Sequence, residues 1–155
     1  MPSFEVVTVV DGAAPQQVFD AALDAELHTR SMGASGEQVV GTLPAGGLGP
    51  GDQVTFAARH FGVRWRLTAV VAVYEPPVRF VDEQVRGPFK RWFHEHEFTP
   101  NGTDGAGGTV MTDRVSFESP LGPLGRIADA LVLRRYMAHL IRTRGRYLAE
   151  VLRQG

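Results

Sequence analysis

The sequence predicts an α+β domain in which an antiparallel sheet packs against one long C-terminal helix. Between residues 38 and 118, apolar and polar side chains alternate in short segments separated by turn residues, which is the pattern of antiparallel strands. One further strand-like segment and two short stretches of helical periodicity precede residue 38, and a longer helical stretch follows residue 118. Strands and helices that are separated in this way along the chain favour an α+β fold.

Composition limits the possible classes of function. The 155 residues are expected to form a single domain, residues 1–155, that buries roughly 70 % of the surface of the unfolded chain. A hydrophobic fraction of 43 %, a charged fraction of 21 % and a formal charge of -1 are those of a globular protein without a general attraction to nucleic acid. The chain has no cysteine, which excludes disulfides, a thiolate nucleophile and cysteine metal sites.

No targeting or membrane signal is recognisable in the sequence. The N-terminal residues lack a basic region followed by an apolar one, and no segment approaches the roughly 18 uninterrupted apolar residues of a membrane span. We therefore expect a cytoplasmic protein without stable membrane insertion. All but one of the 16 basic residues are arginine. Because no aromatic stacking platform accompanies them, nucleic acid is not an expected partner.

Local patterns predict the first three elements. A strand is expected over Phe4–Val10, which is rich in β-branched residues and ends at an Asp-Gly turn. A short helix is expected to begin at Pro15, because proline suits the first helical position and apolar residues at helical spacing follow it. A second short helix is expected over Glu26–Met32.

The remaining strands are spaced as an antiparallel meander. In chain order they are expected at Gln38–Thr42, Asp52–Phe61, Val63–Tyr74, Arg79–Arg86, Trp92–Thr99 and Thr109–Glu118. The glycine- and proline-rich residues 44–51 are expected to form a loop that is either a spacer or a lid over a pocket. One face of the longest strand is expected to carry Trp65, Leu67, Ala69, Val71 and Val73.

The last element is a helix predicted over Leu124–Leu152. Its apolar residues recur on one stripe, and about 29 residues would give a length of roughly 43 Å, enough to cross a small sheet. The other, solvated face is expected to carry most of the arginines, namely Arg126, Arg134, Arg135, Arg142, Arg144, Arg146 and Arg153.

The strand Trp92–Thr99 has the most informative pattern of the chain. Trp92, His94, His96 and Phe98 occupy one face, and the other face is mostly charged. Because a sheet buries its apolar face, both histidines are expected to point inward beside aromatic rings. Buried polar groups need hydrogen-bond partners, so this strand predicts a pocket that contains reactive or ligand-orienting groups.

This succession of elements resembles the helix-grip fold of the START-like superfamily, also called SRPBCC, and looks like its bacterial polyketide cyclase/dehydrase branch. The resemblance covers nearly the whole chain, and its most recognisable part is RFVDEQVRGPF at residues 79–89, continued by Trp92, His94, His96 and Phe98. It implies a curved antiparallel sheet with two short helices wrapped around the long helix, and a cavity for a lipid, a polyketide or another apolar molecule. The superfamily contains both enzymes and binding proteins, so the fold alone does not define the function.

His94, His96 and Asp113 are the candidate catalytic residues. The strand Thr109–Glu118 is expected to pair with the histidine strand, which would bring Asp113 close to a histidine across the ladder. A carboxylate beside an imidazole can fix its tautomer while the imidazole exchanges a proton with a bound carbonyl or hydroxyl. The alternative interpretation is a buried hydrogen-bond network that fixes the register of the strands.

Metal binding is a further alternative for the same residues. His94 and His96 lie on one side of a strand and, together with Asp113, offer nitrogen and oxygen ligands for zinc or iron(II). His-x-His alone is a weak motif, however, and the spacing fixes no third ligand. We therefore predict no metal and no cofactor.

The lining of the pocket is expected to come from several strands and from the last helix. For Arg79–Arg86 we favour the register that turns Phe80, Asp82 and Gln84 inward, because it places Gln84 beside the histidine strand. The residues expected to contact a ligand are Phe56, His60, Trp65, Gln84, Trp92, Phe98, Phe117 and Leu131.

The leading functional hypothesis is a protein that binds an apolar or aromatic small molecule, lipid- or polyketide-like, between the sheet and the last helix. One alternative is a cofactor-independent cyclase, dehydratase or isomerase that uses the three candidate catalytic residues. Another is a lipid carrier for a membrane-associated partner.

Two motifs of hydrolytic enzymes are missing from the sequence. The glycine-rich segment does not end in the Gly-Lys-Ser/Thr of a phosphate loop, and there is no Gly-x-Ser-x-Gly motif, which argues against nucleotide and serine hydrolysis. The sequence identifies neither the ligand nor the oligomeric state.

Overall fold

The computed structural model describes residues 3–41, 43, 47–102, 107–118, 123 and 132–154. The strands are β1 (Ser3–Val10), β2 (Gln38–Val40), β3 (Gln53–His60), β4 (Val63–Glu75), β5 (Arg79–Arg86), β6 (Arg91–Pro100) and β7 (Thr109–Glu118). The helices are α1 (Pro15–Ala22), α2 (Ala25–Ser31), the short 3-10 helix η1 (Gly33–Ser35) and α4 (Arg134–Gln154). The predicted strands and short helices are confirmed, and the ends of the strands differ by no more than two residues.

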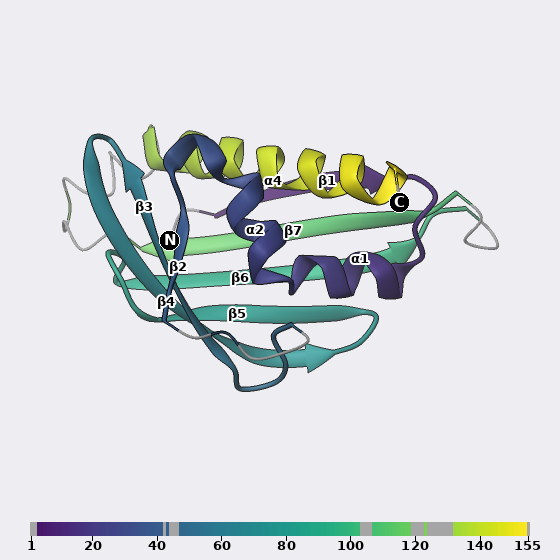
Figure 1. Ribbon diagram of the computed structural model, residues 1–155, viewed down its shortest axis with the longest axis horizontal. Helices are drawn as coiled ribbons and strands as arrows, with labels where there is room; N and C mark the ends of the chain where they lie inside the picture. The colour runs from purple at the N-terminus through teal and green to yellow at the C-terminus, as the bar shows by residue number, and fades with distance from the viewer. Residues whose placement is uncertain are drawn as a thin grey trace.

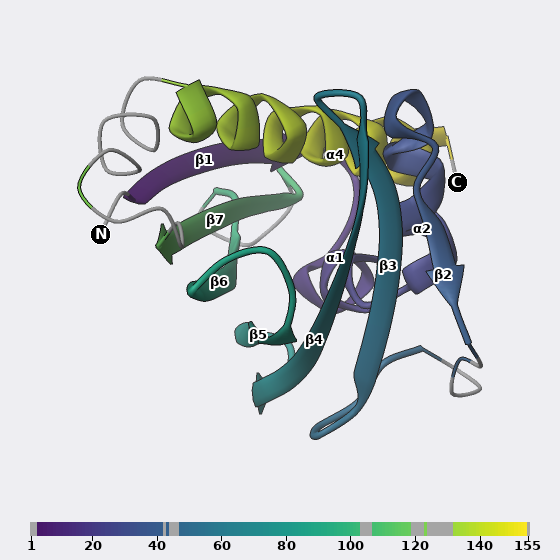
Figure 2. The same cartoon turned by 90° about the vertical axis from the view of Figure 1, so that its left-hand side faces the viewer.

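The strands form one antiparallel sheet of seven strands in the order β1-β7-β6-β5-β4-β3-β2. The sheet curls, and α4 lies across its open side next to β1 (Figures 1 and 2). Helices α1 and α2 contact both each other and α4. This is the helix-grip arrangement that the sequence and its resemblance predict.

Helix α4 packs its apolar stripe against the sheet and carries one arginine on that stripe. Arg144 lies three residues after Ile141 and four before Leu148, which is the spacing of one helix face. It is only 3 % exposed, so its predicted place on the solvated face is wrong. The expected first part of this helix, residues 124–131, lies outside the described residues. In the ranges that are described, no helix is long and apolar enough to cross a membrane.

A β-bulge changes which residues of β4 face inward. Val71 pairs with Asp82, but the next pair is Val73 with Val81, so Ala72 is an extra residue on β4. Tyr74 then pairs with Phe80 and its ring contacts Phe19, with ring centroids 5.4 Å apart. The prediction that Val73 shares a face with Val71 is therefore wrong, because the bulge turns Val73 to the opposite face and brings Tyr74 onto the face of Val71.

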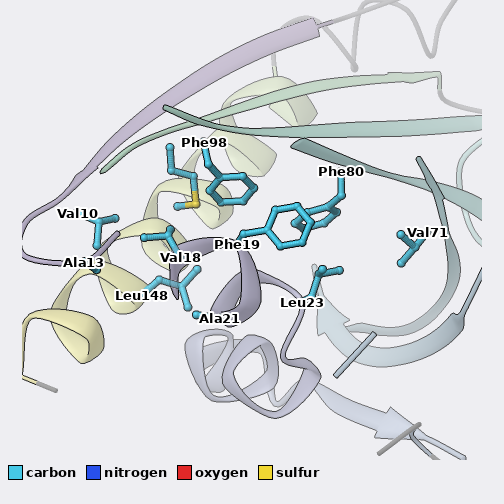
Figure 3. Packing of buried hydrophobic residues seen from close by; sticks show 11 residues of the cluster. Val10, Ala13, Val18, Phe19, Ala21, Leu23, Val71, Phe80, Phe98 and Leu148 are labelled. Atoms are coloured by element: carbon cyan, nitrogen blue, oxygen red, sulfur yellow. The ribbon is translucent and has the colours of Figure 1, made fainter. Parts of the chain in front are cut away.

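Two apolar clusters hold the helices on the sheet. The first surrounds Phe19 of α1, whose ring meets those of Phe80 and Phe98 edge-on at centroid distances of 5.5 and 5.4 Å (Figure 3). The second joins α4 to β1, β6 and β7 and consists of Phe4, Val6, Trp92, Val115, Phe117, Ala138 and Ile141.

Candidate functional site

A cavity of about 400 Å³ lies between the inner face of the sheet and helices α2 and α4. Most of its wall is apolar and includes Met32, Leu67, Met137 and Ile141. Small side chains such as Ala58 and Ala69 occupy inner positions of β3 and β4. Because such side chains fill little volume, the curled sheet and the helix leave a space that the core does not occupy.

Polar side chains form one wall of the cavity. Asp82 of β5, His94 and His96 of β6, and Arg144 of α4 all line it. Asp113 of β7 is completely buried directly behind them. The sheet register explains the cluster, because Asp82 pairs with His94 and His96 pairs with Asp113. The predicted pairing of β6 with β7 and the predicted inward face of β5 are confirmed.

Asp113 is the centre of the polar cluster. Its Oδ1 atom accepts hydrogen bonds from His94 Nε2 at 2.8 Å and from Arg144 Nη2 at 2.8 Å. His96 Nδ1 lies 3.0 Å from the same oxygen. On the other side of its ring, His96 Nε2 lies 2.6 Å from Asp82 Oδ2. The two imidazole rings stack with centroids 3.7 Å apart, so each ring fixes the position of the other.

Burial and the neighbouring charges set the ionisation of these groups. Burial, together with the nearby His96, lowers the pKa of His94 to about 4 from its ordinary 6.5. Burial alone would raise the pKa of Asp113, but Arg144 and the two histidines hold it well below its ordinary value. The pKa of Asp82 is also lowered, because the hydrogen bond to His96 and the nearby charges outweigh burial. Near neutral pH, His94 is therefore neutral and both carboxylates are charged.

A second part of the cavity wall is formed where the β3–β4 hairpin contacts α4. His60 Nδ1 and the Tyr136 hydroxyl lie 2.6 Å apart, and the ring of Phe61 packs on Tyr136 with centroids 4.7 Å apart. Burial lowers the pKa of His60 and raises that of Tyr136, so both groups are neutral near neutral pH. This hydrogen bond ties the hairpin tip to the helix.

The predicted ligand contacts divide into three groups. Phe56, His60, Trp65 and Trp92 line the cavity. Gln84, Phe98 and Phe117 do not, because the Gln84 amide binds the backbone of Phe89 and the two phenylalanines pack in the core clusters. Leu131 lies outside the described residues.

Sequence reasoning missed the role of Arg144 and underestimated that of Asp82. The signal for Arg144 was its place on the apolar stripe of the last helix, where a charged residue needs a buried partner. Asp82 was expected to face inward, but its contact with His96 depends on the register between β5 and β6. The pairing of two strands cannot be read from one strand alone.

The sequence matches one protein family over residues 1–153, described as polyketide cyclase / dehydrase and lipid transport. The chain belongs to this family. A search of the curated proteins returned no match.

Solved structures with the same fold come from several organisms. TTHA0849 from Thermus thermophilus is 18 % identical with a TM-score of 0.75, and the match covers 97 % of each chain. A START superfamily protein from Mycobacterium smegmatis is 12 % identical with a TM-score of 0.68, over 99 % of this chain and 97 % of that one. The major latex-like protein 151 from Panax ginseng is 11 % identical with a TM-score of 0.67, over 96 % and 95 %. Because these sequence identities are low, the comparison shows that the proteins share a fold.

Proposed function

We propose that this protein binds a lipid- or polyketide-like small molecule, apolar or aromatic over most of its surface, in the cavity between the sheet and α4. The observation that carries the proposal is the cavity of about 400 Å³ with its apolar wall. Pockets for small molecules commonly have volumes of about 300–1,000 Å³ and a few polar groups that orient the ligand. Membership in a family described by polyketide cyclisation and lipid transport supports the same class of ligand.

The polar wall defines what the ligand carries at one end. Arg144 is almost completely buried, and its Nε atom has no hydrogen-bond partner among the described residues. The imidazole of His94 faces the same space. Because His94 Nε2 donates to Asp113, its other ring nitrogen can accept a hydrogen bond from a ligand hydroxyl, while the rest of the molecule remains in apolar surroundings.

A second candidate is a cofactor-independent cyclase, dehydratase or isomerase, supported by the contact between His94 and Asp113. Donation from His94 Nε2 to Asp113 leaves Nδ1 as the basic nitrogen of the ring. A pKa of about 4 makes His94 a weak base near neutral pH, and general bases act best when their pKa lies near the working pH. Binding is therefore the first proposal and catalysis the second.

Native mass spectrometry of protein purified under mild conditions tests the binding proposal. We expect a mass above that of the polypeptide, and denaturation should release an apolar compound that can be identified. A protein that carries no small molecule from the cell, and that takes up none from a lipid extract, would contradict the proposal. The cytoplasmic location expected from the sequence remains a prediction.

Incubation of the released compound with fresh protein separates the two candidates. In a binding protein the compound emerges unchanged, and His94→Gln weakens its binding only modestly, because most of the affinity comes from buried apolar area. In an enzyme the compound or its precursor is converted, and His94→Gln lowers the rate by about 10²- to 10⁴-fold. The product is measured by chromatography with mass detection.

A further inference from the structure

We propose that Asp82, His94 and His96 form a binding site for a divalent transition metal, zinc or iron(II), in the polar wall of the cavity. Each of the three residues offers one ligand atom, and these atoms all lie within 4.8 Å of one another. The sequence suggested Asp113 as the third ligand and, without a fixed ligand set, favoured no metal. In the structure the third ligand is Asp82, and Asp113 lies behind the histidines and orients them.

The hydrogen bonds of Asp113 are those of a carboxylate that orients metal-binding histidines. Its Oδ1 atom lies 2.8 Å from His94 Nε2 and 3.0 Å from His96 Nδ1. Arg144 Nη2 also lies 3.3 Å from His96 Nδ1. In the tautomers in which both imidazoles donate to Asp113, His94 Nδ1 and His96 Nε2 are the ring nitrogens left for a metal. Histidine ligands almost always donate their other N–H group to a carboxylate, a carbonyl or water. One buried carboxylate here serves both imidazoles.

The charge of the cluster also favours a cation. The carboxylates of Asp82 and Asp113 and the guanidinium of Arg144 together carry a formal charge of about -1 in a largely buried site. Buried charge without compensation is costly. Arg144 is bound to Asp113 at 2.8 Å, so the carboxylate of Asp82 is the one left to be neutralised. Its Oδ2 atom lies 2.6 Å from His96 Nε2, so a cation bound to this nitrogen would also lie beside the carboxylate.

The ligand set indicates which metals fit. Two imidazole nitrogens and one carboxylate oxygen suit zinc and iron(II), whereas magnesium and calcium prefer oxygen ligands alone. Three protein ligands leave coordination positions open, and all three residues line the cavity. A water molecule or an oxygen of a cavity ligand has access to those positions.

Calorimetric titration of the chelator-treated protein with Zn²⁺ tests the site. We expect one Zn²⁺ per chain, and binding of Co²⁺ with a visible spectrum that differs from that of the aqueous ion because nitrogen replaces water. Asp82→Asn, which keeps the shape of the side chain, should lower the affinity at least tenfold. His94→Ala and His96→Ala should abolish saturable binding. Asp113→Asn should weaken it about 10- to 100-fold, since it removes the group that orients both ligands.

His139→Ala is the matched control, because His139 is an exposed histidine of α4 away from the cavity wall. Its affinity for Zn²⁺ should equal that of the wild type, and circular dichroism shows which variants remain folded. Absence of 1:1 binding to the wild type would overturn the proposal. So would Zn²⁺ binding that persists unchanged in Asp82→Asn and His94→Ala, or Mg²⁺ binding as tight as that of Zn²⁺. The titration uses metal alone, so its result does not depend on whether the cavity binds an apolar ligand.

Discussion

Asp113 is completely buried, yet three donors surround one of its oxygen atoms. Burial of a carboxylate costs several kcal/mol unless charge and hydrogen bonds compensate for it. Arg144 supplies the charge, and the two histidines supply the remaining contacts. The bond to Asp113 in turn stabilises the guanidinium of Arg144, which is 3 % exposed. The two residues therefore depend on each other.

Asp113→Asn should lower the free energy of unfolding by about 3–5 kcal/mol, because it removes the carboxylate that the buried guanidinium of Arg144 binds at 2.8 Å. Urea denaturation followed by circular dichroism measures the change. The double variant Asp113→Leu with Arg144→Met should recover much of the loss, since apolar side chains can replace a buried ion pair. A single variant as stable as the wild type would show that the pair does not hold the cluster together.

Acid should destabilise the metal-free protein through His94. Its pKa is about 4 in the folded chain against an ordinary 6.5, so protonation favours the unfolded chain. The free energy of unfolding should therefore fall as the pH drops from 6.5 to about 4, by about 3 kcal/mol in total from this group.

Urea titrations at several pH values in the presence of a chelator measure this dependence. His94→Gln should flatten the curve in that range, and His139→Gln, at an exposed position, should not. The lowered pKa of His60 adds a smaller dependence in the same direction. If His94→Gln and the wild type lose stability in parallel, His94 does not titrate as described.

At the scale of the elements, local periodicity was enough to find the strands and short helices. The sequence left the register of β5 ambiguous. The favoured register is confirmed for Phe80 and Asp82, which line the cavity, but the reason for favouring it is not, since Gln84 binds the backbone of Phe89. The bulge at Ala72 was not visible, since apolar residues continue at every second position through Val71 and Val73. Arg144 was misplaced because exposure on a helix was inferred from residue type instead of position.

Gly108 shows how tightly two elements meet. Its φ is +97°, and a Cβ atom there would overlap the carbonyl oxygen of Val10 at the end of β1. Gly12 also has a positive φ, +77°, but an added Cβ would meet nothing within 4 Å. The two positions therefore separate the cost of the backbone conformation from the cost of a steric clash.

Gly12→Ala should lower the free energy of unfolding by about 1 kcal/mol, which is the cost of an unfavourable φ. Gly108→Ala should cost clearly more, about 3 kcal/mol, because β1 and the start of β7 must also move apart. Thermal unfolding followed by circular dichroism compares the two variants. Equal losses would indicate that the strand ends adjust freely and that the contact at Gly108 is not tight.

At the scale of the whole molecule, the side chains of the curled sheet and of α4 determine where the two pack together and where a cavity remains between them. The apolar clusters fix the helix at both ends, while small side chains on β3 and β4 leave the cavity between them. The hydrogen bond between His60 and Tyr136 links the β3–β4 hairpin to α4 in the cavity wall. The family resemblance predicted a cavity of this kind, but not its polar wall, since that wall depends on contacts among four separate elements.

The central claim is that this cavity takes up an apolar molecule, and a matched pair of variants tests it most directly. Ala69 lines the cavity, whereas Ala72 on the same strand is exposed. Phenylalanine at position 69 would fill part of the cavity, and phenylalanine at position 72 would not. The measurement is a fluorescence titration with the apolar probe 1-anilinonaphthalene-8-sulfonate, on variants shown to be folded by circular dichroism. We predict that the wild type and Ala72→Phe bind one probe molecule with equal affinity and that Ala69→Phe binds at least tenfold more weakly. Equal binding by all three proteins, or no binding by the wild type, would contradict the claim.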